Sequence, residues 1–174
     1  MRKEMEVSTD IMFVNKPPFL VRIRGGMKFT TIEYLSIKDE KSLVTSINKI
    51  VSYFKSHGLH VGTMFVDPEF QFLEGNVVIT TANKTGAREH VPEVERQIQV
   101  IKERIQAHHS NPPFPSFTRW TTIELAKHVV MFLNTFPPKS GLSKTDSPHT
   151  IMTGKYIDWK KSYKLHFGSY VKVH

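Results

Sequence analysis

The chain has 174 residues, 39% of them hydrophobic, so it is long enough to bury one sizeable core and too short for two full domains. It carries 24 Lys and Arg against 16 Asp and Glu, a formal net charge of +8, which favours a polyanionic partner such as nucleic acid. It contains no cysteine, which excludes a disulfide partner, Cys-based zinc sites and a Cys nucleophile.

The first part of the chain predicts three consecutive strands. Apolar and β-branched residues cluster in residues 5–14, 19–24 and 28–35. The turn signals Asn15-Lys16-Pro17-Pro18 and Gly25-Gly26 separate these runs. We therefore expect an antiparallel meander.

An amphipathic helix and an interior strand are expected next. Ser36 and Asp39 have the Ser-x-x-Asp form of a capping box, and apolar residues recur behind them at steps of three and four as far as Gly58. Residues 59–66 are apolar nearly throughout, which is typical of an interior strand. That strand ends at Asp67-Pro68.

The rest of the chain predicts a fifth strand at residues 77–81 and then two helices. Pro92 is suited to the first turn of a helix whose apolar stripe runs to about His108. A second helix spans roughly residues 117–134, and its segment 129–133 is apolar on every face, which predicts burial.

The predicted order is three strands, a helix, two strands and two helices, an α/β domain with a mixed five-stranded sheet. We expect one domain over residues 5–140 and a C-terminal extension over residues 141–174 that packs on it, with residues 167–173 strand-like. The N-terminus lacks the apolar region of a signal peptide, and no apolar run approaches the roughly 20 residues of a membrane span. We therefore expect an intracellular protein without a membrane partner.

Three acidic residues lie where an α/β domain forms sites. Asp10 interrupts the apolar first strand, Asp67 ends the fourth, and Glu95 lies in the first turn of the helix that begins near Pro92. Three converging carboxylates repel each other unless a cation neutralises them, and hard oxygen ligands select magnesium or manganese. Two such ions, about 3.5 to 4 Å apart, can activate a water or a 3′-hydroxyl and stabilise the leaving oxygen of a phosphodiester.

Each acid also has a plainer interpretation. Asp67 before Pro68 is typical of a turn, and Glu95 is a first-turn acid of the kind that the helix dipole favours. Asp10 would need no partner if it faced outward from its strand. Spacing alone leaves both interpretations open.

The order and wording of these motifs resemble the integrase region of copia-type retroelements. In that family a first Asp sits on the opening strand, a second follows an apolar strand in an Asp-…-Glu-Phe context, and a third acid precedes Arg. Asp10, Asp67-Pro68-Glu69-Phe70 and Glu95-Arg96 take those places here.

The resemblance continues downstream and spans nearly the whole chain, from about Val7 to the end. Leu133-Asn134-Thr135-Phe136-Pro137 resembles the family's Leu-Asn-Arg-x-Pro. Residues 147–155 resemble its Thr-Pro-x-x-x-x-x-Gly-Lys turn, and residues 167–174 resemble its Phe-Gly-x-x-Val-x-Val-His segment. Each motif alone is weak, and five in the right order are moderately specific.

This resemblance implies a ribonuclease H-like integrase core that performs metal-dependent DNA cleavage and strand transfer. Asp10, Asp67 and Glu95 would be its Asp-Asp-Glu triad and would bind two Mg²⁺ or Mn²⁺ ions. DNA would be the partner, and the core would work as a homo-oligomer. A eukaryotic element would place the protein in the nucleus.

Two departures from the family pattern concern the second and third acids. The family usually carries Asp-Asn-Gly-Gly-Glu-Phe, so residues 67–70 are two residues shorter, and residues 88–92 replace a Gln-x-Asn-Gly loop. The zinc-binding His-His-Cys-Cys module that precedes such cores needs cysteine, which the sequence lacks. The alternative to an active enzyme is a diverged, catalytically inactive fragment that binds nucleic acid or serves as a domesticated interaction module. An unrelated basic α/β domain is the third interpretation.

DNA contacts are predicted on the helix that carries Glu95. Gln99 and Lys102 project from the same face as Glu95, and Arg96 follows it directly. The resemblance places that face against DNA near the active site. An ordinary solvated helix face is equally consistent with these residues. No pair among the nine histidines has convincing ligand spacing, so none is assigned to a metal.

Overall fold

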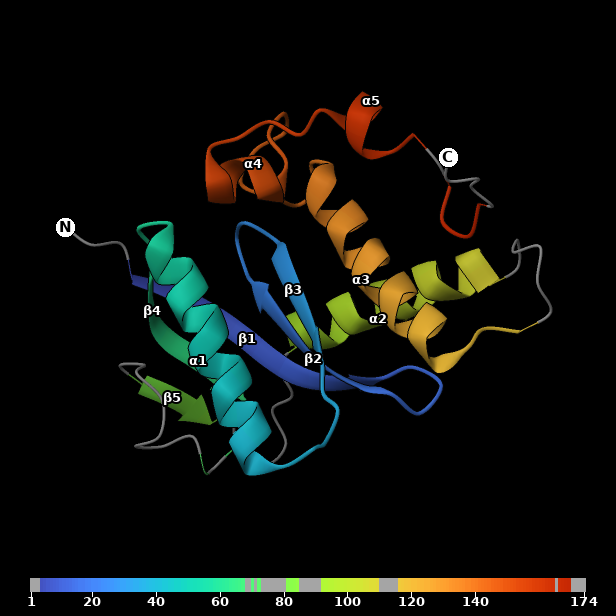
Figure 1. Ribbon diagram of the computed structural model, residues 1–174. Coiled ribbons are helices and arrows are strands. Elements are labelled where there is room, and N and C mark those ends of the chain that lie inside the picture. Colours follow the sequence, from blue (N-terminus) through green and yellow to red (C-terminus); the bar gives the residue numbers. More distant parts are fainter. Residues whose placement is uncertain are drawn as a thin grey trace.

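The computed structural model describes residues 4–67, 70, 72, 81–84, 92–109, 116–164 and 166–169. The strands β1 (Glu4–Phe13), β2 (Pro18–Arg24), β3 (Phe29–Tyr34), β4 (His60–Val66) and β5 (Thr81–Lys84) form a sheet in the order β3-β2-β1-β4-β5. The helices are α1 (Glu40–Ser56), α2 (Pro92–His109), α3 (Arg119–Thr135), α4 (Pro148–Thr153) and α5 (Trp159–Ser162) (Figure 1).

The sheet is mixed, as the sequence predicts. β1, β2 and β3 form the antiparallel meander, in which Asp10 lies opposite Val21 and Val21 lies opposite Ile32. β4 runs parallel to β1, because α1 forms the crossover that parallel strands require. The fifth strand was expected at residues 77–81. Residues 73–80 lie outside the described residues, and the short β5 begins at Thr81.

The start of α1 differs from the prediction. Asp39, not Ser36, is the N-cap, and its Oδ1 accepts a hydrogen bond from the backbone N–H of Ser42 at 2.8 Å. An Asp side chain at this position satisfies an amide that has no partner within the helix. α1 ends where expected, because Gly58 has a φ of +74°, a conformation that residues with a Cβ rarely adopt.

Two hydrophobic clusters cover opposite faces of the sheet, which gives three layers. α1 packs one face, with Ile47 among the residues that meet Met64 of β4. α2 and α3 pack the other, where Ile101 and Val129 belong to the same cluster as Phe19 of β2. Strand residues therefore alternate between an α1 side and an α2/α3 side, and each functional side chain can be placed by this alternation.

The burial predicted for the second half of α3 is correct only in part. Val129 and Val130 are buried, but Met131 is 48% exposed and Phe132 is 39% exposed. A helix on the surface of a sheet buries one side only, whatever the polarity of the residues on its other side.

The C-terminal segment contacts the rest of the chain at two described places. Met152 of α4 is buried in the α1-side cluster, and the hydroxyls of Tyr163 and Thr135 are 2.6 Å apart. In the predicted strand 167–173, residues 167–169 form a turn instead, and residues 170–173 lie outside the described part. Within the described residues, no helix is long and apolar enough to cross a membrane.

Candidate functional site

Asp10 and Asp67 are carried by neighbouring parallel strands. The register of β1 and β4 runs from Glu4 opposite His60 to Ser8 opposite Phe65. Continued for two more residues along each chain, this register sets Asp10 beside Asp67. The two carboxylates therefore meet at the end of β4, where the strand order of an α/β sheet places sites.

Both carboxylates belong to the α2/α3 side of the sheet. Asp10 lies opposite Val21, which is part of the α2/α3-side cluster, and residues directly opposite one another in a sheet share a face. Phe65 packs against the same cluster, and Asp67 follows it by two residues. Both aspartates are half-buried. Oδ1 of Asp10 accepts a hydrogen bond from the N–H of Ile11 at 2.6 Å.

Glu95 lies on the same side of the sheet but is exposed in the first turn of α2. Its neighbour Glu93 anchors that turn through an ion pair with Lys28 in the β2–β3 turn. Glu93 also closes over Gly25, where a Cβ would lie 2.7 Å from Glu93 Oε2. The β1–β2 register, continued by two residues, sets Gly25 opposite Glu6.

This attachment separates the first turn of α2 from the two aspartates. Glu6 precedes Asp10 by four residues, which is about 13 Å along an extended strand. Within the described residues, no group of three or more His, Asp or Glu side chains is arranged to hold a metal ion. The structure thus brings Asp10 and Asp67 together and leaves Glu95 apart from them.

The donor set at the aspartate pair suits a hard cation. Mg²⁺ is commonly held by one or two carboxylates, with waters or substrate phosphates completing its shell. Asp10 and Asp67 supply such a pair of carboxylates, and neither histidine nor sulfur is needed. The residues fit one hydrated ion.

The three DNA-contacting candidates are all exposed on α2. Gln99 donates a hydrogen bond to Glu103 at 3.1 Å, one turn along the helix. Lys102 lines a hollow of about 520 Å³ together with Asn15 of the β1–β2 turn. Arg96 lies near the start of the helix and lines a different hollow. They form a polar face that extends along α2.

Arg22 is a buried charged residue that sequence reasoning missed. It lies in the central strand β2, is 2% exposed, donates to Ser46 Oγ of α1 and lies 3.7 Å from a carboxylate oxygen of Glu33. Burial lowers the pKa of Arg22 to about 10, although the charge and hydrogen bond of Glu33 oppose the shift. The signal was present, because Arg22 interrupts an apolar strand just as Asp10 does.

No family model matches the chain, and no curated protein matches it. Among solved structures, it resembles the catalytic core domain of BIV integrase with a TM-score of 0.58 and 15% identity, covering 86% of this chain and 94% of that one. It also resembles a chain of the simian T-cell lymphotropic virus intasome in complex with a PP2A regulatory subunit, with a TM-score of 0.64 and 11% identity. That match covers 86% of this chain and 54% of the other, so this chain spans about half of its length.

At these identities the likeness shows the fold. The chain has a mixed α/β fold like that of integrase catalytic cores, consistent with the ribonuclease H-like fold expected from the sequence. The finer assignment to copia-type elements stays a prediction.

Proposed function

We propose that the chain is an integrase-like polynucleotidyl transferase core of copia type, which cuts DNA and joins its strands with the help of bound metal. The observation that carries this proposal is the pairing of Asp10 with Asp67 at the end of β4, within the fold of integrase catalytic cores. The net charge of +8 supports a polyanionic substrate. An intasome contains one of the similar chains, which supports DNA as the partner and a homo-oligomer as the working form.

Asp10 and Asp67 would hold Mg²⁺ or Mn²⁺, and Glu95 would complete a two-ion site once the first turn of α2 approaches the pair. The metal would supply an activated water or 3′-hydroxyl and charge neutralisation at the phosphate. Arg96, Gln99 and Lys102 would bind the DNA backbone along α2 and set the position of the phosphodiester.

A second function is favoured by the anchoring of α2. Because Glu93 is held by Lys28 and covers Gly25, the described arrangement keeps Glu95 away from the aspartates. An inactive core would use the same basic face of α2 to bind nucleic acid without cleaving it. Binding would then weaken with salt, because phosphate contacts release counterions.

The experiment that tests the first function is nicking and strand transfer on supercoiled DNA with Mg²⁺ or Mn²⁺. The wild-type chain is compared with Asp10→Asn and Glu95→Gln. Glu40→Gln is the matched control, because Glu40 is the first-turn acid of α1 as Glu95 is of α2. We expect activity in the wild type and in Glu40→Gln, and its loss in the other two variants.

Equal activity in all four proteins would reject the assignment of Asp10 and Glu95. A lack of activity in all four, combined with DNA binding that Lys102→Glu weakens, would establish the second function instead. A salt titration of DNA binding supports that conclusion if the slope is shallower in Lys102→Glu than in the wild type.

A further inference from the structure

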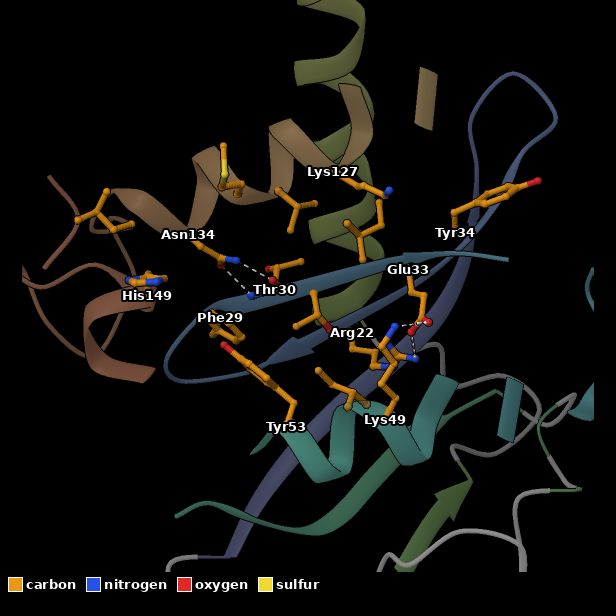
Figure 2. Close-up of a pocket in the computed structure, with 16 residues that line it drawn as sticks. Arg22, Phe29, Thr30, Glu33, Tyr34, Lys49, Tyr53, Lys127, Asn134 and His149 are labelled. Carbon is orange, nitrogen blue, oxygen red and sulfur yellow. Dashed lines mark hydrogen bonds and ion pairs between the residues drawn. The ribbon is translucent and has the colours of Figure 1, made fainter. Parts of the chain in front are cut away.

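The edge strand β3 forms the floor of a groove of about 690 Å³ between α1 and α3 (Figure 2). One wall comes from α1 and the other from α3, and α4 contributes His149 near one end. The walls are lined by Lys49, Ile50 and Tyr53 of α1 and by Lys127, Val130 and Met131 of α3. Each wall therefore offers one lysine beside an apolar surface.

The outer edge of β3 is partly satisfied and partly open. Asn134 of α3 bonds both backbone groups of Thr30: the Thr30 N–H donates to Asn134 Oδ1 at 2.9 Å, and Asn134 Nδ2 donates to the Thr30 carbonyl at 2.7 Å. Backbone groups alternate between the two sides of a strand, so the N–H and C=O of Ile32 and the N–H of Tyr34 point to the same outer side as those of Thr30. These groups form a short hydrogen-bonding edge within the groove.

The groove is cationic and contains donors that lack acceptors. Arg22, Lys49 and Lys127 line it against a single carboxylate, that of Glu33. Within the described residues, Arg22 Nε and Thr31 Oγ1 are buried without a hydrogen-bond partner, although Arg22 is 2% exposed. Buried donors of this kind call for an acceptor, and carboxylate oxygens are the acceptors that a guanidinium binds best.

We propose that this groove binds an extended segment of a partner protein, in which acidic and apolar residues alternate, as an added strand beside β3. An added strand pairs its backbone with the open edge, and its side chains alternate between the two walls. Apolar residues would contact Tyr53 and Met131, and acidic residues would meet Lys49 and Lys127. Lys49 already pairs with Glu33 at 3.2 Å and Lys127 with Glu124 at 2.7 Å, so the acidic residues would compete for partly engaged cations.

The geometry favours a single segment over a second copy of this chain. The β3 strand of a second copy would be flanked by its own α1 and α3, and these helices would collide with the same walls before the strands met (Figure 2). The groove also lies at the β3 end of the sheet, whereas Asp10 and Asp67 lie at β1 and β4. Peptide binding and the proposed handling of DNA are therefore separable.

The test uses the full chain and a fluorescent probe peptide, Ac-Val-Asp-Val-Asp-Val-Asp-Val-amide, followed by fluorescence anisotropy. A peptide with Pro at its centre cannot complete the ladder, and one with Lys in place of Asp has the wrong charge. Ile32→Pro removes the outward N–H of Ile32 while sparing the β2 ladder, since Pro is tolerated at strand edges where the N–H faces outward. Ile32→Val is its control, and Lys144→Glu is the exposed control for Lys127→Glu.

We expect the wild type, Ile32→Val and Lys144→Glu to bind the probe alike. Ile32→Pro and Lys127→Glu should each weaken binding roughly tenfold, as expected for the loss of one hydrogen bond or one charge contact. The amide signal of Ile32 should move on titration in an NMR spectrum. Equal binding of the Asp and Lys peptides, or an unmoved Ile32 amide, would overturn the proposal. A wild-type dimer that Lys127→Glu converts to a monomer would also overturn it, because the occupant would then be a second copy.

Discussion

The side-chain amide of Asn134, near the end of α3, bonds both backbone groups of Thr30 on the edge strand β3. Asn134 is 8% exposed and Thr30 is 1% exposed, so water has little access to either bond. One side chain thus joins a helix to the sheet edge and closes part of the backbone that an edge strand otherwise leaves open.

Replacing Asn134 by Ala should lower the free energy of unfolding by about 2 to 4 kcal/mol, because two buried backbone groups lose their partner. Urea denaturation followed by circular dichroism measures the change. Asn48→Ala, a half-buried asparagine on α1, is the matched control and should change stability by less than about 0.5 kcal/mol. Similar losses in both variants would contradict the role assigned to Asn134.

Glu33 should stabilise the fold in a pH-dependent way. Burial alone would raise the pKa of Glu33, but hydrogen bonds from Ser46 and Lys49 and the charge of Arg22 outweigh it and hold that pKa below its usual 4.5. The ionised carboxylate therefore contributes stability above about pH 4.5, and this contribution is lost as the pH falls through the lowered pKa. In denaturant titrations, Glu33→Gln should be less stable than the wild type near neutral pH, with a gap that narrows in acid. A gap that stays constant with pH would refute this coupling.

His128 should make the protein less stable in mild acid. It packs between His108 of α2, with ring centroids 5.9 Å apart, and Phe167 near the C-terminus, at 5.3 Å. Burial, together with the charge of His108, lowers the pKa of His128 from 6.5, so the unfolded chain takes up this proton more readily than the folded one. Stability should therefore fall as the pH drops below about 6.5.

The melting temperature between about pH 7.5 and 5.5 tests the role of His128. His128→Phe should show a shallower decline than the wild type. His166→Gln changes an exposed histidine nearby and should follow the wild type. Parallel declines in all three proteins would show that another group is responsible.

Much of the fold could be predicted because its elements have strong local patterns. Alternating and apolar runs placed β1 to β4, and Pro92 with its apolar stripe placed α2 within one residue of its observed end. The exposure of Met131 could not be predicted, because its neighbours in α3 are equally apolar and only the packing decides which side faces the sheet.

The candidate site divides in the same way. Asp10 and Asp67 follow from strand order and alternation, which the sequence displays directly. The position of Glu95 depends on a contact between Glu93 and Lys28, which are far apart in the sequence, and no local pattern reports such a contact. The third carboxylate was for this reason the one whose position could not be settled before the structure.

The most direct test of the central claim, that Asp10 and Asp67 form a metal-binding pair, is a calorimetric titration with Mn²⁺. The wild-type chain is compared with Asp10→Asn, Asp67→Asn and the exposed control Asp158→Asn. We predict that the wild type and Asp158→Asn bind Mn²⁺ with the same affinity, and that each of the other two variants loses roughly tenfold or more, since each removes a ligand of one shared ion. Unchanged Mn²⁺ affinity in both Asp10→Asn and Asp67→Asn would contradict the account.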